Sequence, residues 1–250
     1  MRLQFLLAVV LFQLPAATIS AAQDATPLSA GEVVERMVQR DAQRQSLIQG
    51  YGGMRRYVLE NNGMHKHAEM LVRVIGDSDG TKHFEVLSEQ GWKAAQKHVL
   101  RKMLESESQT SRPEARAKIR LSPDNYAFQM VGQENVGDRI AYAIEVTPKR
   151  HDQYLFAGRI WVDAEDYALV RADGNPAKNP SFWTKHVHFI HTYQKNGPFW
   201  FPLCTESVTD ARIFGRTDLT IEYFDYKPRG QSSQAASEIT LASMQGSYKR

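Results

Sequence analysis

Residues 158–174, which read GRIWVDAEDYALVRADG, contain the clearest β-hairpin signal in the chain. Strand-like runs extend from Gln153 to Asp163 and from Ala168 to Asp173, and the acidic segment 164–166 separates them. Short runs of this kind on either side of Asp and Glu residues are typical of two antiparallel strands joined by a turn. The stretch therefore predicts a hairpin, and the same pattern continues on both sides of it.

Strand-like segments repeat at intervals of roughly ten residues over most of the chain, as in antiparallel meanders. Turn residues such as those at 135–138 and 195–197 separate the segments. We therefore predict a mainly β fold of the α+β class, built on one antiparallel sheet. The predicted strands are Met54–Glu60, Met64–Ile75, Thr81–Leu87, Tyr126–Glu134, Arg139–Thr147, Gln153–Asp163, Ala168–Asp173, Phe182–Gln194, Phe199–Ala211 and Ile213–Tyr226.

Two segments have a helical period instead. Ser29 and Glu32 have the spacing of a capping box, and an apolar stripe continues to Ile48, so we predict a helix over 29–48. A second helical segment is predicted near 91–118, with an amphipathic helix over 91–107 and a short turn after Pro113. In that helix one face carries Trp92, Ala95, Val99 and Met103, and another carries Lys93, Lys97 and Arg101.

The first 22 residues have the pattern of a signal peptide, with a positive Arg2, an apolar run over 3–14 and small residues before Gln23. We expect cleavage near Ala22 and export to the periplasm; an uncleaved membrane anchor is the alternative. Residues 23–228 are predicted to form one domain, and 229–250 a polar, flexible tail.

Composition and motifs limit the function classes. The 31 Lys and Arg residues nearly balance the 28 Asp and Glu residues, which argues against a nucleic-acid-binding protein. Cys204 is the single cysteine, so an internal disulfide is impossible, and no lipidation cysteine follows the signal peptide. No phosphate-binding loop, dinucleotide motif or nucleophile elbow occurs. We therefore expect a freely diffusing monomer that is not an enzyme and needs no cofactor.

Paired histidines are the main sign of metal chemistry. His186 and His188 share one face of a strand, a pairing that zinc accepts, and His65 and His67 repeat the spacing. His191 faces the other side of its strand, and no carboxylate shares the expected face at close spacing. We therefore predict exposed strand histidines and no metal site, with a metal-dependent enzyme as an alternative.

The order of elements and the hairpin together resemble the LolA-like periplasmic lipoprotein carriers, the outer-membrane lipoprotein-sorting family. The resemblance covers roughly residues 29–227, and Val162-Asp163, the turn, and Leu169-Val170-Arg171 carry it most clearly. It implies a strongly curved, incomplete β-barrel closed by helices that act as a lid over an apolar cavity. Residues 72–76 lack the family's Pro, and the Lys- and Arg-rich helix 91–107 stands where the carriers have a different lid segment, so the chain resembles a divergent member. The resemblance implies that Arg55 or Arg56 takes the place of the carriers' lid-holding Arg.

The implied function is a periplasmic carrier or binding protein for lipid or lipoprotein acyl chains, with an inner- or outer-membrane protein as acceptor. An envelope-stress sensor or interaction protein of the same fold is the alternative. The basic stripe of Lys93, Lys97 and Arg101 is a candidate contact for headgroups or a partner, or else a solvated helix face. Candidate cavity residues, each of which could instead simply fill the core, are Trp161, Trp183, Phe189, Phe201, Trp92, Val99 and Met103.

Overall fold

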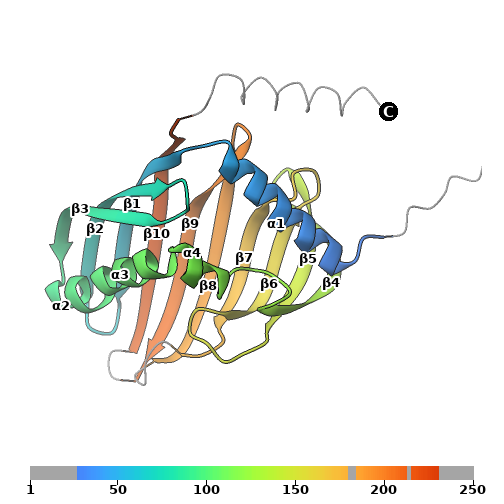
Figure 1. Ribbon diagram of the computed structural model, residues 1–250. Coiled ribbons are helices and arrows are strands. Elements are labelled where there is room, and N and C mark those ends of the chain that lie inside the picture. Colours follow the sequence, from blue (N-terminus) through green and yellow to red (C-terminus); the bar gives the residue numbers. More distant parts are fainter. Residues whose placement is uncertain (1–26, 180–183, 213–214, 231–250) are drawn as a thin grey trace, which may run out of the picture.

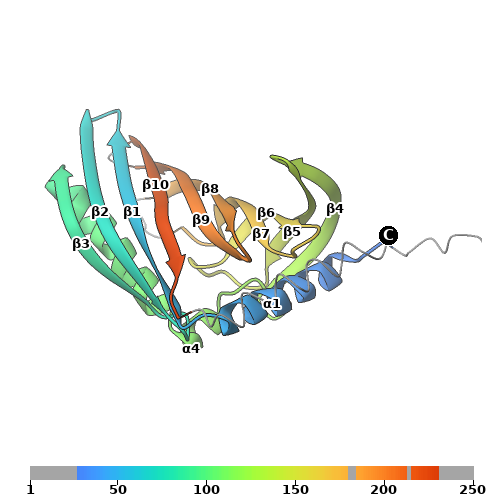
Figure 2. The same ribbon diagram turned by 90° about the horizontal axis from the view of Figure 1, so that it is seen from above.

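The computed structural model describes residues 27–179, 184–212 and 215–230, and in it ten strands form one antiparallel sheet (Figure 1). The strand order is β3-β2-β1-β10-β9-β8-β7-β6-β5-β4, so two meanders meet where β1 pairs with β10. The sheet is curved but not closed, and β3 and β4 are its two edges (Figure 2). This confirms the predicted fold class. The strands are β1 (Gly50–Asn61), β2 (Lys66–Asp77), β3 (Lys82–Gly91), β4 (Tyr126–Val136), β5 (Arg139–Pro148), β6 (Phe156–Asp163), β7 (Leu169–Pro176), β8 (Thr184–Asn196), β9 (Phe199–Ala211) and β10 (Gly215–Pro228).

The helix α1 (Ala30–Ser46) begins at the predicted capping box. The backbone N–H of Ser29 donates to Glu32 Oε2 at 2.8 Å, and the backbone N–H of Glu32 donates to Ser29 Oγ at 3.3 Å. Two backbone donors at the start of the helix are thereby satisfied. The apolar face of α1 packs on β4–β7 through Ala30, Val33, Val34 and Met37.

The inward face of the sheet can be followed residue by residue across the strand pairings. Its middle row has two apolar ends and a polar centre at Thr205 and His191. One apolar end packs under the helical segment 93–110 and the other under α1. We call this the concave face, because both groups of helices cover it (Figure 1). The row runs through Met70, Tyr57, Ile221, Thr205, His191, Ala172, Ile160, Ile144 and Met130.

The segment predicted as one amphipathic helix over 91–107 contains a change of helix type. It consists of α2 (Lys93–Ala95), the π-helical η1 (Gln96–Leu100) and α3 (Arg101–Thr110), and the short α4 (Pro113–Ala117) follows. The π turn adds a residue to the helical repeat, so the buried face moves from Ala95 to Leu100 and Leu104. Val99 is consequently 40% exposed, which corrects its expected place on the inward face.

None of the helices among the described residues is long and apolar enough to cross a membrane.

Candidate functional site

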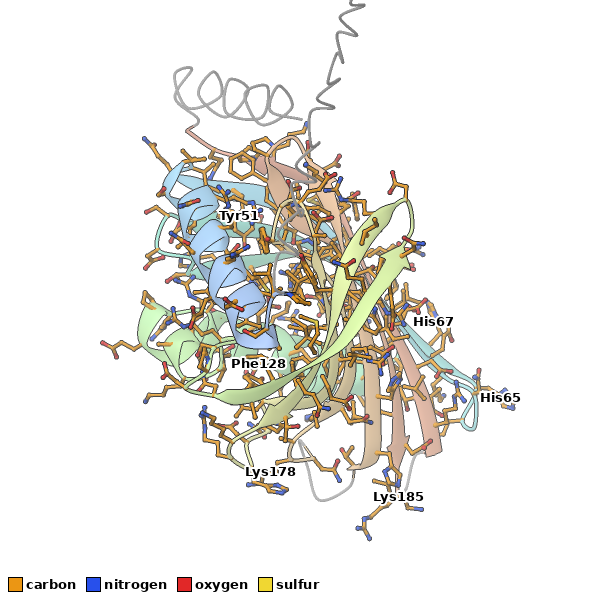
Figure 3. All side chains as sticks on the ribbon, turned by 90° about the vertical axis from the view of Figure 1, so that its right-hand side faces the viewer. Tyr51, His65, His67, Phe128, Lys178 and Lys185 are labelled. Carbon is orange, nitrogen blue, oxygen red and sulfur yellow. The ribbon has the colours of Figure 1, made fainter. Side chains whose placement is uncertain are left out.

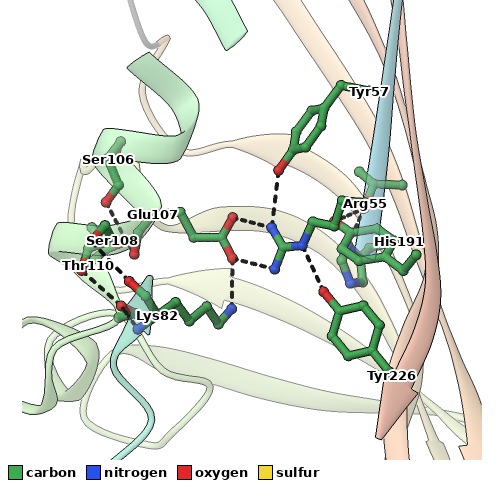
Figure 4. Close-up of polar contacts among 12 residues, drawn as sticks. Arg55, Tyr57, Lys82, Ser106, Glu107, Ser108, Thr110, His191 and Tyr226 are labelled. Atoms are coloured by element: carbon green, nitrogen blue, oxygen red, sulfur yellow. Dashed lines mark hydrogen bonds and ion pairs between the residues drawn. The ribbon is translucent and has the colours of Figure 1, made fainter. Parts of the chain in front are cut away.

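Three charged side chains on the concave side form an ion-pair cluster, which we call the latch: Arg55 of β1, Lys82 of β3 and Glu107 of α3 (Figure 4). Arg55 Nη1 donates to Glu107 Oε2 at 2.6 Å, and Nη2 donates to Oε1 at 3.0 Å. Lys82 Nζ donates to the same Oε1 at 2.7 Å. Since both cations belong to the sheet and the carboxylate belongs to the helix, the latch holds α3 against the sheet.

Arg55 faces inward because side chains alternate along β1, and its neighbours on that face are Tyr57 and Leu59. Only 2% of its surface is exposed. Arg55 Nε donates to Tyr226 Oη at 2.8 Å, and Nη1 also donates to Tyr57 Oη at 3.2 Å. The guanidinium therefore has hydrogen-bond partners on each of its nitrogens, as a buried charge requires. Arg56 points the other way, to Glu69 and Glu222, so Arg55 is the arginine that holds a helix.

The latch is fully ionised. Burial would raise the pKa of the Glu107 carboxyl, but the charges of Lys82 and Arg55 outweigh burial and hold that pKa well below its ordinary value. Burial would likewise lower the pKa of the Lys82 ammonium, and the charge of Glu107 raises it instead. Two cations and one carboxylate leave the cluster with one net positive charge.

A cavity of about 490 Å³ lies beside the latch. Its walls come from the end of α1, from the junction between α3 and α4, and from the centre of the concave face. The walls combine aromatic and aliphatic side chains with the charged groups of the latch. Lining residues include Ile48, Tyr51, Phe199, Phe201 and Tyr223 on the apolar side, and Arg44, Arg55, Lys82, Glu107 and Arg116 on the charged side.

His191 and Tyr193 supply the polar centre of the cavity wall, and the centroids of their rings lie 4.6 Å apart. His191 Nδ1 is 2.5 Å from Thr205 Oγ1, which in turn is 3.0 Å from Tyr223 Oη. Burial, with the positive charges of Lys82 and Arg55, lowers the pKa of His191 to about 4, so the imidazole is neutral. Burial raises the pKa of the Tyr193 hydroxyl to about 12.

The structure separates the strand residues expected to line a cavity. Phe201 lines it, whereas Phe189 lies further along the concave face and packs against Phe156 under α1. Trp161 alternates with Ile160 and therefore lies on the opposite, convex face, where its Nε1–H donates to Glu134 at 2.8 Å. Its expected place inside the sheet is thus wrong. Trp183 falls outside the described residues.

The candidates on the helical segment lie beside this cavity and not in its wall. Trp92 and Met103 are partly buried against the core beneath α2 and α3. Lys93 and Lys97 are exposed, and Arg101 forms two bonds of 2.8 Å to Glu89 on β3. The basic stripe is therefore a solvent-facing surface in which one of three charges is already paired.

The strand histidines do not assemble a metal site. No group of three or more His, Cys, Asp or Glu side chains in the described part of the chain could hold an ion. His188 Nε2 is 2.8 Å from Asp173 Oδ1 on the exposed face, and Figure 3 shows His65 and His67 at the far end of the β1–β2 hairpin. His191 faces the opposite side, as expected, but it is partly buried in the cavity and not exposed.

Sequence reasoning missed most of this site. Lys82 and Glu107 lie 25 positions apart and carry no motif, and only the fold brings them together. Arg55 was visible as one of two candidates, and the alternation with Tyr57 and Leu59 was the signal that could have selected it.

Residues 28–179 match the family model described as the MucB/RseB N-terminal domain. No curated protein matches the chain. A DUF1329 family protein from Desulfovibrio piger is similar in structure, with 15% identity, a TM-score of 0.43, and coverage of 85% of this chain and 98% of that one. A LolA superfamily protein from Nitrosomonas europaea has 9% identity and a TM-score of 0.42, over 83% and 97% of the two chains. The MucA/MucB complex of Pseudomonas aeruginosa gives 10% identity and a TM-score of 0.28, over 80% and 99%.

Proposed function

The chain belongs to the MucB/RseB family, and we propose that it is a binding protein, not an enzyme, which holds a lipid or a lipoprotein's acyl chains between its sheet and its helices. The cavity of about 490 Å³ is the observation that carries this proposal. Its size lies within the range of about 300 to 1,000 Å³ that is usual for small-molecule sites.

The aromatic wall of the cavity suits an acyl chain. Three strands contribute its aromatic side chains, which are Tyr51 of β1, Phe199 and Phe201 of β9, and Tyr223 of β10, and Ile48 faces them from just beyond the end of α1. Each methylene removed from water contributes about 0.8 kcal/mol, so six methylenes contribute about 5 kcal/mol before the costs of association. Binding of useful strength thus needs no catalytic group.

The latch gives the site a means of control. The junction of α3 and α4 forms one wall of the cavity, and the contact of Glu107 with Arg55 and Lys82 fixes that wall to the sheet. Widening the cavity requires this contact to break. Ligand release therefore depends on an event that opens the latch, such as contact with an acceptor protein.

The setting that we propose is the periplasm, in outer-membrane lipoprotein sorting or envelope lipid transport. The signal-peptide pattern that ends near Ala22 supports export. The ligand would be a lipid or an acylated lipoprotein, and an inner- or outer-membrane protein would receive it.

Family membership favours one second candidate, an envelope-stress regulator that binds a partner protein. The family takes its name in part from MucB, and the MucB of Pseudomonas aeruginosa forms a complex with MucA. In this chain the same cavity would then sense a lipid, and the bound state would be reported to a membrane partner.

Organic extraction and mass spectrometry of the untagged protein test the proposal. Stoichiometric lipid is the expected result, and a ligand-free protein that also fails to bind added fatty acid would reject it. The variant Ile48→Trp fills the cavity and should at least halve the lipid content. Leu203→Trp is the matched control, because Leu203 is 43% exposed and lies outside the cavity wall. A pull-down from native envelopes then separates a carrier from a regulator with a fixed partner.

A further inference from the structure

Three side chains in the cavity wall retain hydrogen-bonding capacity that the protein does not fill. Lys82 Nζ has three donor hydrogens, and among the described residues its hydrogen-bond acceptor is Glu107 alone. His191 uses Nδ1 on Thr205, and neither its Nε2 nor Tyr193 Oη has a hydrogen-bond partner within the described ranges. All three side chains line the same cavity.

The charge of the cavity wall favours an anion at this place. The cavity is lined by four cations and three carboxylates, so one positive charge is in excess: Arg44, Arg55, Lys82 and Arg116 against Asp41, Asp77 and Glu107. The latch also has one positive charge in excess. All three guanidinium nitrogens of Arg55 donate hydrogen bonds, to Glu107, Tyr57 and Tyr226. Lys82 is therefore the cation of the latch that keeps unpaired donor hydrogens, and 30% of its side chain is accessible. The charges that act on His191 are those of Lys82, Arg55 and Glu107, and their sum is positive.

The two neutral groups act as donors. If Tyr223 donates to Thr205 and Thr205 donates to His191 Nδ1, the imidazole carries its proton on Nε2. Tyr193 remains a phenol, because burial raises its pKa to about 12. Nε2–H and Oη–H can then both donate to an oxygen atom in the cavity.

We propose that Lys82, His191 and Tyr193 form a binding site for the single negatively charged group of an acyl ligand, a carboxylate or a phosphodiester. The acyl chain would lie against the aromatic wall at Phe199 and Phe201. This inference rests on the proposed function and specifies its ligand class. It implies that the protein distinguishes an anionic amphiphile from an uncharged one of the same chain length.

Displacement of a neutral fluorescent probe, N-phenyl-1-naphthylamine, from the full chain provides the test. The competitors are laurate, methyl laurate and lauroyl lysophosphatidylglycerol. They share one acyl chain length and differ in the head group, which is a carboxylate, an uncharged ester and a phosphodiester respectively. We expect at least one anion to bind about tenfold more tightly than the methyl ester, which corresponds to one charge-assisted hydrogen-bonded pair. The two anions identify whether a carboxylate or a phosphodiester is preferred.

Variants assign the preference to the three side chains. Lys82→Met should reduce the preference for the anion to about twofold or less, while Lys82→Arg should retain most of it. Tyr193→Phe removes one hydroxyl group and should lower the affinity for the anions but not the affinity for the methyl ester. Lys66→Met, which removes an exposed cation outside the cavity and outside the basic stripe, is the control and should change neither affinity. In an NMR titration, bound anion should also raise the apparent pKa of His191, and methyl laurate should not.

The outcomes are distinct. Equal affinity of the wild type for anions and ester would overturn the anion site and leave the acyl-binding function intact. A preference that survives Lys82→Met would place the anion elsewhere and equally reject the inference. Failure of all three competitors and of the probe to bind would reject the proposed function itself.

Discussion

The replacement of Glu107 by Gln is the most informative single change, because it removes the anion of the latch and keeps the shape of the side chain. Arg55, which is 2% exposed, would then lie buried with only Tyr57, Tyr226 and a neutral amide as partners. Breaking a buried ion pair costs about 3 to 5 kcal/mol. Since 32% of the Glu107 side chain is accessible, we expect a smaller loss of about 2 to 4 kcal/mol in the free energy of unfolding.

Urea denaturation at neutral pH measures this loss, and Glu105→Gln on the exposed side of the same helix is the control. The control should change the free energy by less than about 0.5 kcal/mol. Hydrogen exchange should show faster opening of α3 in Glu107→Gln than in wild type, while α1 stays protected. A Glu107→Gln protein as stable as the control, with unchanged exchange in α3, would refute the view that the latch holds this helix.

Three further predictions concern residues outside the latch. Because the folded pKa of His191 lies at about 4 and its ordinary value is 6.5, only the unfolded chain gains this proton between those values. The stability should therefore fall as the pH drops from 6.5 to 4, and His191→Asn should flatten that part of the profile; an unchanged profile contradicts the assignment. Trp161→Ala should cost about 3 kcal/mol in urea denaturation and leave the affinity for laurate unchanged; a large loss of affinity would place Trp161 at the site after all. Neutralising Lys93, Lys97 and Arg101 together should reduce binding to anionic vesicles at low salt if the stripe meets headgroups; equal binding by the variant and the wild type would make it a solvated face.

The fold was accessible from the sequence because its signals are local. The capping box at Ser29 and Glu32, the turns between strands and the period of two along each strand all report on neighbouring residues. These features are sufficient to predict an antiparallel meander and its first helix. The pairing of β1 with β10, which joins the two meanders, is a contact between distant segments and has no local signal.

The site was less accessible, for two physical reasons. A one-residue change of register turns a side chain to the other face of a sheet, so aromatic content alone could not place Trp161 outside and Phe201 inside. The π turn at Gln96–Leu100 likewise shifts a helical face, and this segment contains no proline or glycine that would indicate an irregular helix. Glu107 acquires its importance only through the buried Arg55 that it contacts, and Lys82 through its contact with Glu107.

Photo-crosslinking with a diazirine-labelled fatty acid, followed by peptide mapping, tests the central claim most directly. If the acyl chain lies between the concave face and the helices, the label should react with the segments that contain Ile48, Tyr193 and Phe201. Glu107→Gln should change the yield without moving the sites of reaction. Crosslinks at the convex face around Trp161, or none above the level seen with denatured protein, would contradict the account.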